Sequence, residues 1–191
     1  MNSKILLSGI GGQGVLFAHQ LIAECAVAQQ LDVTGAETHG MSQRGGSVVS
    51  HLKIGETSSP LIRQGTADWL LAFDASEALR SMPFIRAGGN VIVNSGSTDF
   101  AGERLMAHLA ALNVSLCTVD ADSIARALGR ISAANVALLG YASTCTGFPL
   151  SQQSLQETIV RIAPERFREL NLKAFQGGVT AGLARLQPAG R

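Results

Sequence analysis

KILLSGIGGQGV, residues 4–15, is the stretch that decides the fold of this chain. A short apolar run ends in glycines, and apolar residues then recur at three- and four-residue spacing. The run predicts a buried strand over residues 4–8, and the spacing predicts a helix over residues 12–30. The stretch therefore indicates a strand, a tight turn and a helix in direct succession.

The turn carries Gly9, Gly11 and Gly14 at the G-x-G-x-x-G spacing of dinucleotide-binding loops. Glycines let the backbone approach a ligand closely, and the following helix aims free N–H groups at an anion. In a dinucleotide site an acid about 20 residues further on binds the ribose hydroxyls, and Glu37 stands near that distance. The alternative is that the glycines only make a tight turn. Gln13 carries an amide at the tip of the loop, suited to a ligand or another subunit.

Strand-like and helix-like segments alternate along the rest of the chain. We expect strands at residues 32–37, 47–55, 69–73, 90–96 and 114–119, and helices at residues 75–82, 102–112, 122–128, 133–143, 151–162 and 164–170. This alternation predicts a Rossmann-like α/β fold: a doubly wound, mostly parallel sheet with helices on both faces. Ligands bind beyond the carboxyl ends of such strands. We therefore expect the loops at residues 8–14, 37–46 and 74–77 to converge on one rim.

The composition limits the classes of protein to which this chain can belong. The chain has 191 residues, of which 46% are apolar and 15% charged, which indicates one globular domain rather than disorder. A formal net charge of +1 without a Lys/Arg run argues against a nucleic-acid partner. No signal-like or bilayer-length apolar stretch stands out, so we expect no membrane association and a cytoplasmic location. We assign residues 1–178 to the domain and residues 179–191 to a flexible C-terminal tail.

The three cysteines are far apart in the sequence and form no C-x-x-C motif. Iron–sulfur clusters and structural zinc sites use closely spaced thiolates, so we expect neither on this chain, nor any other metal site. Cys25, Cys117 and Cys145 are instead expected to be small buried hydrophobes.

A second loop narrows the function. GIGGQGV near the start, together with ETHGMSQRGGSVVSHLKIG at residues 37–55, resembles the small subunit of indolepyruvate:ferredoxin oxidoreductase. More broadly, it is similar to the gamma subunit or domain of the 2-oxoacid:ferredoxin oxidoreductases. LLAFDASEALR (70–80), GGNVIVN (88–94) and AANVALLG (133–140) continue the likeness to about residue 178. The form HGMSQRGG is typical of the indolepyruvate branch.

The resemblance implies that the holoenzyme converts an arylpyruvate, coenzyme A and oxidised ferredoxin into an aryl-acetyl-CoA, carbon dioxide and reduced ferredoxin. It places thiamine diphosphate, Mg²⁺ and the iron–sulfur clusters on a large alpha subunit. This chain then binds no cofactor alone, carries no catalytic residue and is inactive by itself. Without its partner, we expect the loop at residues 38–46 to be mobile or to pack against another copy, so that the isolated chain could form a homo-oligomer. A stand-alone NAD(P)- or flavin-binding oxidoreductase and a docking-only subunit are the alternatives.

The resemblance also makes the two loops a surface for coenzyme A or for the active-site wall. The expected members are Gly11, Gly12, Gln13, Gly14, Glu37, His39, Ser42, Arg44 and Gly45. Arg44 either binds a phosphate or carboxylate with its guanidinium fork or forms an interface salt bridge. Glu37 either bonds a ligand hydroxyl or anchors its own loop. His39 either orients substrate and relays protons or is a hydrogen-bonded interface residue.

Other polar residues have structural interpretations. Asp74 follows a strand, and Asp74 or Ser76 is expected to cap the next helix. Asn135 is expected to tie a helix to a neighbouring loop. We expect His51 in the core or an interface, and His19 and His108 on the surface.

Overall fold

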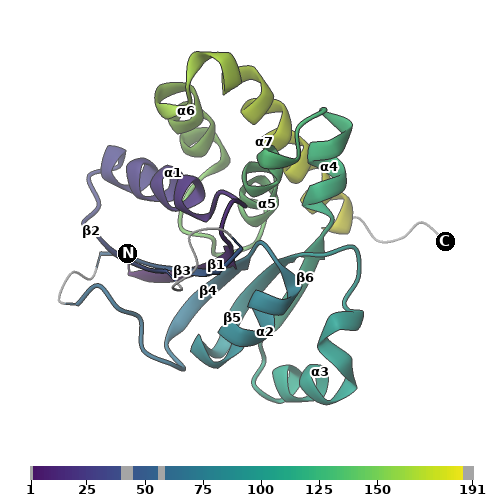
Figure 1. Ribbon diagram of the computed structural model, residues 1–191. Coiled ribbons are helices and arrows are strands. Elements are labelled where there is room, and N and C mark those ends of the chain that lie inside the picture. Colours follow the sequence, from purple (N-terminus) through teal and green to yellow (C-terminus); the bar gives the residue numbers. More distant parts are fainter. Residues whose placement is uncertain (1, 40–44, 56–58, 187–191) are drawn as a thin grey trace.

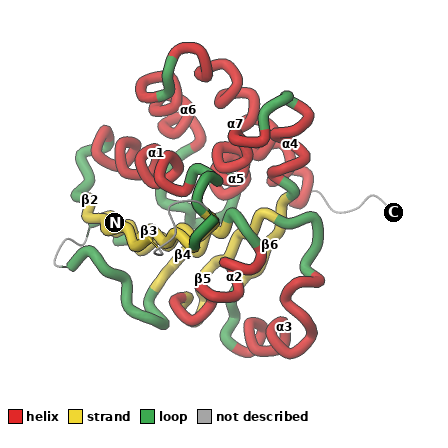
Figure 2. Tube along the Cα trace, viewed as in Figure 1, coloured by secondary structure: helices red, strands yellow, loops and turns green. Residues whose placement is uncertain are grey.

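A computed structural model describes residues 2–39, 45–55 and 59–186, and its centre is one six-stranded sheet (Figures 1 and 2). The strands are β1 (Ser3–Ile10), β2 (Val33–His39), β3 (Ser47–Ile54), β4 (Ala67–Ala72), β5 (Ile85–Asn94) and β6 (Ser115–Val119). Their order in the sheet is β2-β3-β1-β4-β5-β6. β1, β4, β5 and β6 are parallel neighbours, whereas β3 runs antiparallel to both β1 and β2. The prediction of a mostly parallel sheet is confirmed, with β3 as the strand that runs the other way.

Helices cover both faces of the sheet. They are α1 (Val15–Ala28), α2 (Ala75–Ser81), α3 (Gly102–Ala111), α4 (Ala121–Ala127), α5 (Ala134–Ala142), α6 (Gln152–Ile162) and α7 (Glu165–Leu186). Figure 1 shows α2 and α3 on one face and the other five on the opposite face. This confirms the doubly wound architecture. Within the ranges that the structure describes, no helix is long and apolar enough to cross a membrane.

Two hydrophobic cores sandwich the sheet, and strand β1 contributes to both. Ile5 and Leu7 belong to the larger core under α1 and α5, while Leu6 belongs to the smaller core over α2 and α3. This split follows from the period of two along a strand. All three side chains are fully buried, as the apolar run at the start of the chain predicts.

Helix α7 corrects the prediction of a flexible tail from residue 179, because it continues to Leu186. Gly178 lies where α7 crosses α5, and a Cβ there would collide with the backbone carbonyl of Ala137. The glycines that lower helix propensity therefore allow α5 and α7 to pack backbone to backbone. Residues 187–191 lie outside the described residues.

Candidate functional site

The two glycine-bearing loops meet at the carboxyl end of β1. Ile10, the last residue of β1, pairs with Ser47, the first residue of β3. Just beyond this pair the Gly11 N–H donates a hydrogen bond of 2.8 Å to the carbonyl of Gly46. The antiparallel strand thus brings the end of the second loop against the first, which confirms their expected convergence.

The three glycines of the G-x-G-x-x-G spacing have contacts inside the protein. A Cβ on Gly9 would lie 2.8 Å from Gln13 Oε1 and 2.9 Å from Val15 Cγ2, so a larger residue here would displace the Gln13 side chain. The Gly11 N–H is bound to the second loop, as described above. Gly14 has a left-handed φ of 77°, and its carbonyl accepts a 2.9 Å hydrogen bond from Asn135 Nδ2 on α5. The structural role predicted for Asn135 is confirmed.

Gln13 and Gly12 differ in what they offer to a ligand. The Gln13 side chain folds back so that its Oε1 accepts a 2.7 Å hydrogen bond from the Ile10 N–H. Only the Nε2 end of the amide is left for a partner at the tip of the loop. Gly12 is exposed, has φ of 102°, and a Cβ there would meet no atom within 4 Å. Gly12 is therefore the point where the loop backbone is open to an approaching molecule.

The N-terminus of α1 adds a positive pole beside this open backbone. Its N-cap residue, Gly14, has no side chain to cap the first N–H groups, and the first turn holds no acidic residue. Uncapped N–H groups and the helix dipole together favour an anion. Leu16 in the same turn is 42% exposed, so the surface next to the pole is apolar. The arrangement suits a phosphate or carboxylate attached to an apolar group or carried by a protein partner.

Glu37 is not brought next to the glycine loop. It pairs with Ser50 on β3, and Ser50 pairs in turn with Leu7 on β1. Two interstrand spacings place its backbone roughly 10 Å from β1. In a dinucleotide site the acid ends the strand adjacent to the glycine loop. The antiparallel β3 occupies that adjacent position here, so the second half of the fingerprint is not reproduced.

The described histidines divide between packed and exposed positions. His19 is half-buried, and its Nδ1 lies 2.5 Å from Ser50 Oγ, which corrects its prediction as a surface residue. Burial lowers the pKa of His19, while the nearby Glu37 acts in the opposite direction. His51 is buried in the sheet, as predicted, and burial likewise lowers its pKa. His108 is exposed, as predicted.

The second loop is described only at its two ends. His39 is the last residue of β2, and the description covers its backbone alone. Gly45 is exposed, with a left-handed φ of 77°. Ser42 and Arg44 lie outside the described residues, so their roles stay predictions.

Glu77, which sequence reasoning did not single out, joins the third post-strand loop to this rim. It is only 4% exposed, and its Oε2 accepts a 2.5 Å hydrogen bond from Ser47 Oγ at the start of β3. Its Oε1 pairs with Arg80 at 2.9 Å. Asp74 Oδ1 accepts the N–H of Ser76 at 2.8 Å, which confirms the predicted cap. A Glu is almost never buried without partners, but Ser47 is 30 residues away from Glu77, so no local pattern could reveal their contact.

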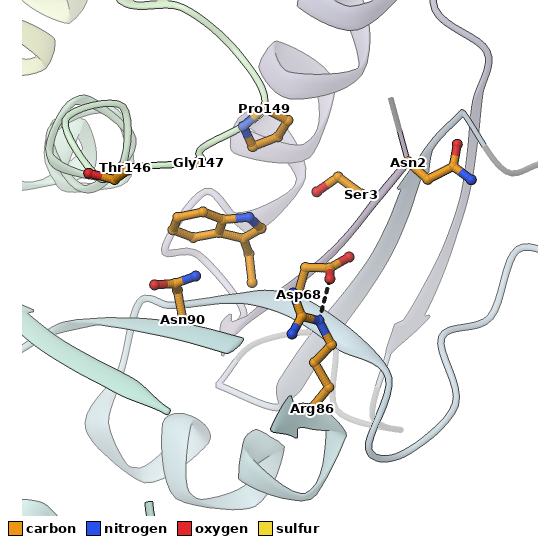
Figure 3. A pocket seen from close by; sticks show the side chains of 9 residues that line it. Asn2, Ser3, Asp68, Arg86, Asn90, Thr146, Gly147 and Pro149 are labelled. Atoms are coloured by element: carbon orange, nitrogen blue, oxygen red, sulfur yellow. Dashed lines mark hydrogen bonds and ion pairs between the residues drawn. The ribbon is translucent and has the colours of Figure 1, made fainter. Parts of the chain in front are cut away.

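A separate cavity lies at the opposite, amino edge of the sheet (Figure 3). It encloses about 220 Å³ beside Asp68 and Arg86, whose ion pair measures 2.6 Å. Asp68 also accepts the backbone N–H of Lys4 at 2.8 Å. The charged groups of this cavity are thus paired with one another, and the cavity lies at the amino ends of the strands, remote from the two loops. No group of three or more His, Cys, Asp or Glu residues suited to a metal ion occurs within the described part of the chain.

Comparison with known proteins fits this geometry. An indolepyruvate oxidoreductase subunit IorB from Methanothermobacter thermautotrophicus is 34% identical over 192 residues, covering 95% of this chain and 98% of the relative. An IorB subunit from Thermococcus kodakarensis is 33% identical, covering 93% of this chain and 95% of that protein. The crystal structure of a keto/oxoacid ferredoxin oxidoreductase gamma subunit from Geobacter sulfurreducens superposes with a TM-score of 0.74 at 29% identity, covering 95% of this chain and 99% of that one.

The family model described as pyruvate ferredoxin/flavodoxin oxidoreductase matches residues 4–181, which include both loops and all of the sheet except Ser3 at the start of β1. The match and the relatives agree with the resemblance drawn from GIGGQGV and ETHGMSQRGG. The chain therefore belongs to the pyruvate ferredoxin/flavodoxin oxidoreductase family.

Proposed function

We propose that this chain is the small subunit of an arylpyruvate:ferredoxin oxidoreductase and forms one wall of the coenzyme A site of the assembled enzyme. The observation that carries the proposal is the Gly11–Gly46 hydrogen bond of 2.8 Å, which fastens the two loops together. Relatives at 33–34% identity, named indolepyruvate oxidoreductase subunits, support the arylpyruvate class.

Coenzyme A is suited to this wall by its charge and shape. Its phosphates match the uncapped N-terminus of α1, and the open backbone at Gly12 lets a ligand or the large subunit come close. Arg44, five residues after the end of β2 by sequence, would add a guanidinium fork for a phosphate or a substrate carboxylate. Glu77 holds Ser47, and thereby the re-entry of the second loop into the sheet.

The large subunit would hold thiamine diphosphate with Mg²⁺ and the iron–sulfur clusters, and would reduce ferredoxin. Thiamine diphosphate supplies the stabilised carbanion chemistry of 2-oxoacid decarboxylation. This chain's own contribution is to position coenzyme A and to exclude water at the shared wall. It is therefore required for activity without carrying the reacting groups.

Co-expression with the large subunit tests the proposal. We expect a stable complex that reduces ferredoxin with arylpyruvate and coenzyme A, and neither subunit alone should do so. A complex that does not form, or a large subunit that is fully active by itself, would refute it.

Arg44→Ala separates the coenzyme A wall from a docking-only role. We expect the complex to assemble while the KM for coenzyme A rises about tenfold, because a charge-assisted phosphate contact contributes on the order of 1.5 kcal/mol. The matched control is Arg63→Ala, which removes an exposed arginine between β3 and β4 and should leave this KM unchanged. Unchanged kinetics in Arg44→Ala would leave docking as the role of the loop.

A further inference from the structure

Two cysteines that are distant in the sequence share one arginine at the outer edge of the sheet. Cys117 lies in β6, Cys145 follows α5, and Arg185 is in the last turn of α7. Arg185 Nη1 donates a hydrogen bond to Cys117 Sγ, and Nη2 lies 4.0 Å from Cys145 Sγ. Both cysteines are half-buried, which corrects their prediction as buried hydrophobes, whereas Cys25 is buried as predicted.

The guanidinium of Arg185 has sulfur and aromatic neighbours in place of a carboxylate. Within residues 2–39, 45–55 and 59–186, the ion pairs involve other arginines or a lysine. The Tyr141 ring centroid lies 5.6 Å from its central carbon. Burial raises the pKa of Tyr141 to about 12, so this phenol is neutral. The positive charge of Arg185 is therefore available to stabilise negative charge on sulfur.

The three cysteine sulfurs differ in their contact with Arg185 and in their burial. Cys145 has the longer contact with Arg185, lies 3.9 Å from the carbonyl of Tyr141, and has its pKa raised by burial, which favours the neutral thiol. Cys25 also has its pKa raised by burial, and it is fully enclosed in the core. Cys117 accepts a hydrogen bond from the guanidinium and is partly exposed. Of these three thiols, it is the one placed to react as a thiolate.

Cavities give small molecules access to Cys117. One of about 450 Å³ lies at the carboxyl end of β6, and another of about 180 Å³ lies beside Cys145; Cys117 and Arg185 line both. Asp120 is the carboxylate that lines the larger cavity. It accepts hydrogen bonds from Ser123 N and Oγ at 2.8 and 2.6 Å, and these bonds lower its pKa. Among the described residues, Arg185, Tyr141 and Cys145 are the ionisable groups that interact with the Cys117 sulfur, and Asp120 lines the same cavity.

We propose that Cys117 is an oxidation site for small peroxides, with Arg185 stabilising its reactive thiolate. The thiolate sulfur attacks one oxygen of hydrogen peroxide and the O–O bond breaks. The sulfur loses two electrons and becomes a sulfenic acid, and hydroxide leaves and takes up a proton to form water. Oxidation converts the Cys117 sulfur, which accepts the hydrogen bond from Arg185, into a larger S–OH group. The end of α7, which carries Arg185, is therefore the segment expected to move.

Site-resolved labelling of the full-length chain tests this assignment. The chain is treated with hydrogen peroxide and a sulfenic-acid trap, or with iodoacetamide, and each cysteine peptide is followed by mass spectrometry. We expect Cys117 to react about tenfold or more faster than Cys145, and Cys25 to react only on unfolding. Equal rates for Cys117 and Cys145, or a faster Cys25, would overturn the proposal.

Arg185 variants distinguish charge stabilisation from simple exposure. In Arg185→Gln the rate of Cys117 alkylation at neutral pH should fall about tenfold, because the guanidinium no longer stabilises negative charge on the sulfur. Arg185→Lys should retain part of the effect. Arg126→Gln, which breaks an exposed ion pair on α4, should leave this rate unchanged. An unchanged rate in Arg185→Gln would contradict a role for the guanidinium, and the wild-type order of rates decides the assignment if that variant does not fold.

Discussion

The carboxyl ends of the strands are held by different kinds of contact in the two halves of the sheet. In the parallel half, side chains at the ends of β4 and β5 bind the starts of the helices: Asp74 caps α2, and Asn94 Oδ1 accepts the N–H of Ala121 at the start of α4 at 3.0 Å. In the half formed by β2, β3 and β1, the rim is built from two loops held backbone to backbone through Gly11 and Gly46.

This difference shows that a glycine motif takes its meaning from the strand beside it. G-x-G-x-x-G indicates dinucleotide binding when the next strand lies parallel and adjacent and ends in an acid. Here the antiparallel β3 is adjacent, and the end of the second loop is bonded to Gly11 through the carbonyl of Gly46. The same local turn thereby becomes a joint between two loops.

Gly14→Ala should produce the largest loss of stability at this joint. An alanine in the left-handed conformation costs about 1–2 kcal/mol, and a Cβ would collide with the Asn135 amide and break its hydrogen bond, for about 1 kcal/mol more. Gly129→Ala is the matched control, because its φ is also 77° and the space around it is open. Urea unfolding should give a lower free energy of unfolding for Gly14→Ala than for Gly129→Ala. Equal losses in the two variants would show that the contact with Asn135 on α5 does not contribute to stability.

Glu77→Ala should give the next largest effect, about 2 kcal/mol, because it leaves Ser47 Oγ without its buried acceptor. It also tests whether the parallel half supports the two-loop half. In the assembled enzyme we expect a higher KM for coenzyme A, and Glu77→Gln should restore part of it. Glu169→Ala removes an exposed pair with Lys173 and should be nearly silent in both measurements. A Glu77→Ala variant with wild-type stability would show that the parallel half does not support the two-loop half through Glu77.

Local signals in the sequence were sufficient for most of the fold. Apolar runs located β1 and β4, and helical spacing located α1, because these elements bury most of the residues that define their patterns. The end of α7 was mispredicted because propensity counts Gly178 and Gly182 against a helix, whereas close packing on α5 favours them.

The site was less accessible to sequence reasoning because its contacts are long-range. Asn135 and Asp74 were correctly interpreted, the latter because a cap is a local feature. The strand order was not predictable from the spacing between Gly14 and Glu37, so their separation by β3 was missed. Glu77 with Ser47, and Cys117 with Arg185, are pairs whose members lie 30 and 68 residues apart.

The smallest expected effect concerns His19, which packs between α1 and the β2–β3 pair. Because burial lowers its pKa, the unfolded chain binds more protons below the ordinary value of 6.5, and stability should fall as the pH drops through that value. His51 contributes in the same direction. Between pH 7.5 and 5.5, urea unfolding should show a smaller loss of the free energy of unfolding in His19→Gln than in the wild type. An identical loss would show that the pH dependence does not come from His19.

Calorimetric titration of the isolated chain with NADH, NADPH and flavin dinucleotide tests most directly whether β3 has replaced the dinucleotide site. With the second loop fastened to Gly11 and Glu37 two strands away, we predict no binding at concentrations up to about 1 mM, the weak end of specific affinity. Binding in the micromolar range, weakened by Gly12→Asp at the exposed loop, would contradict the account and restore the dinucleotide interpretation of GIGGQG.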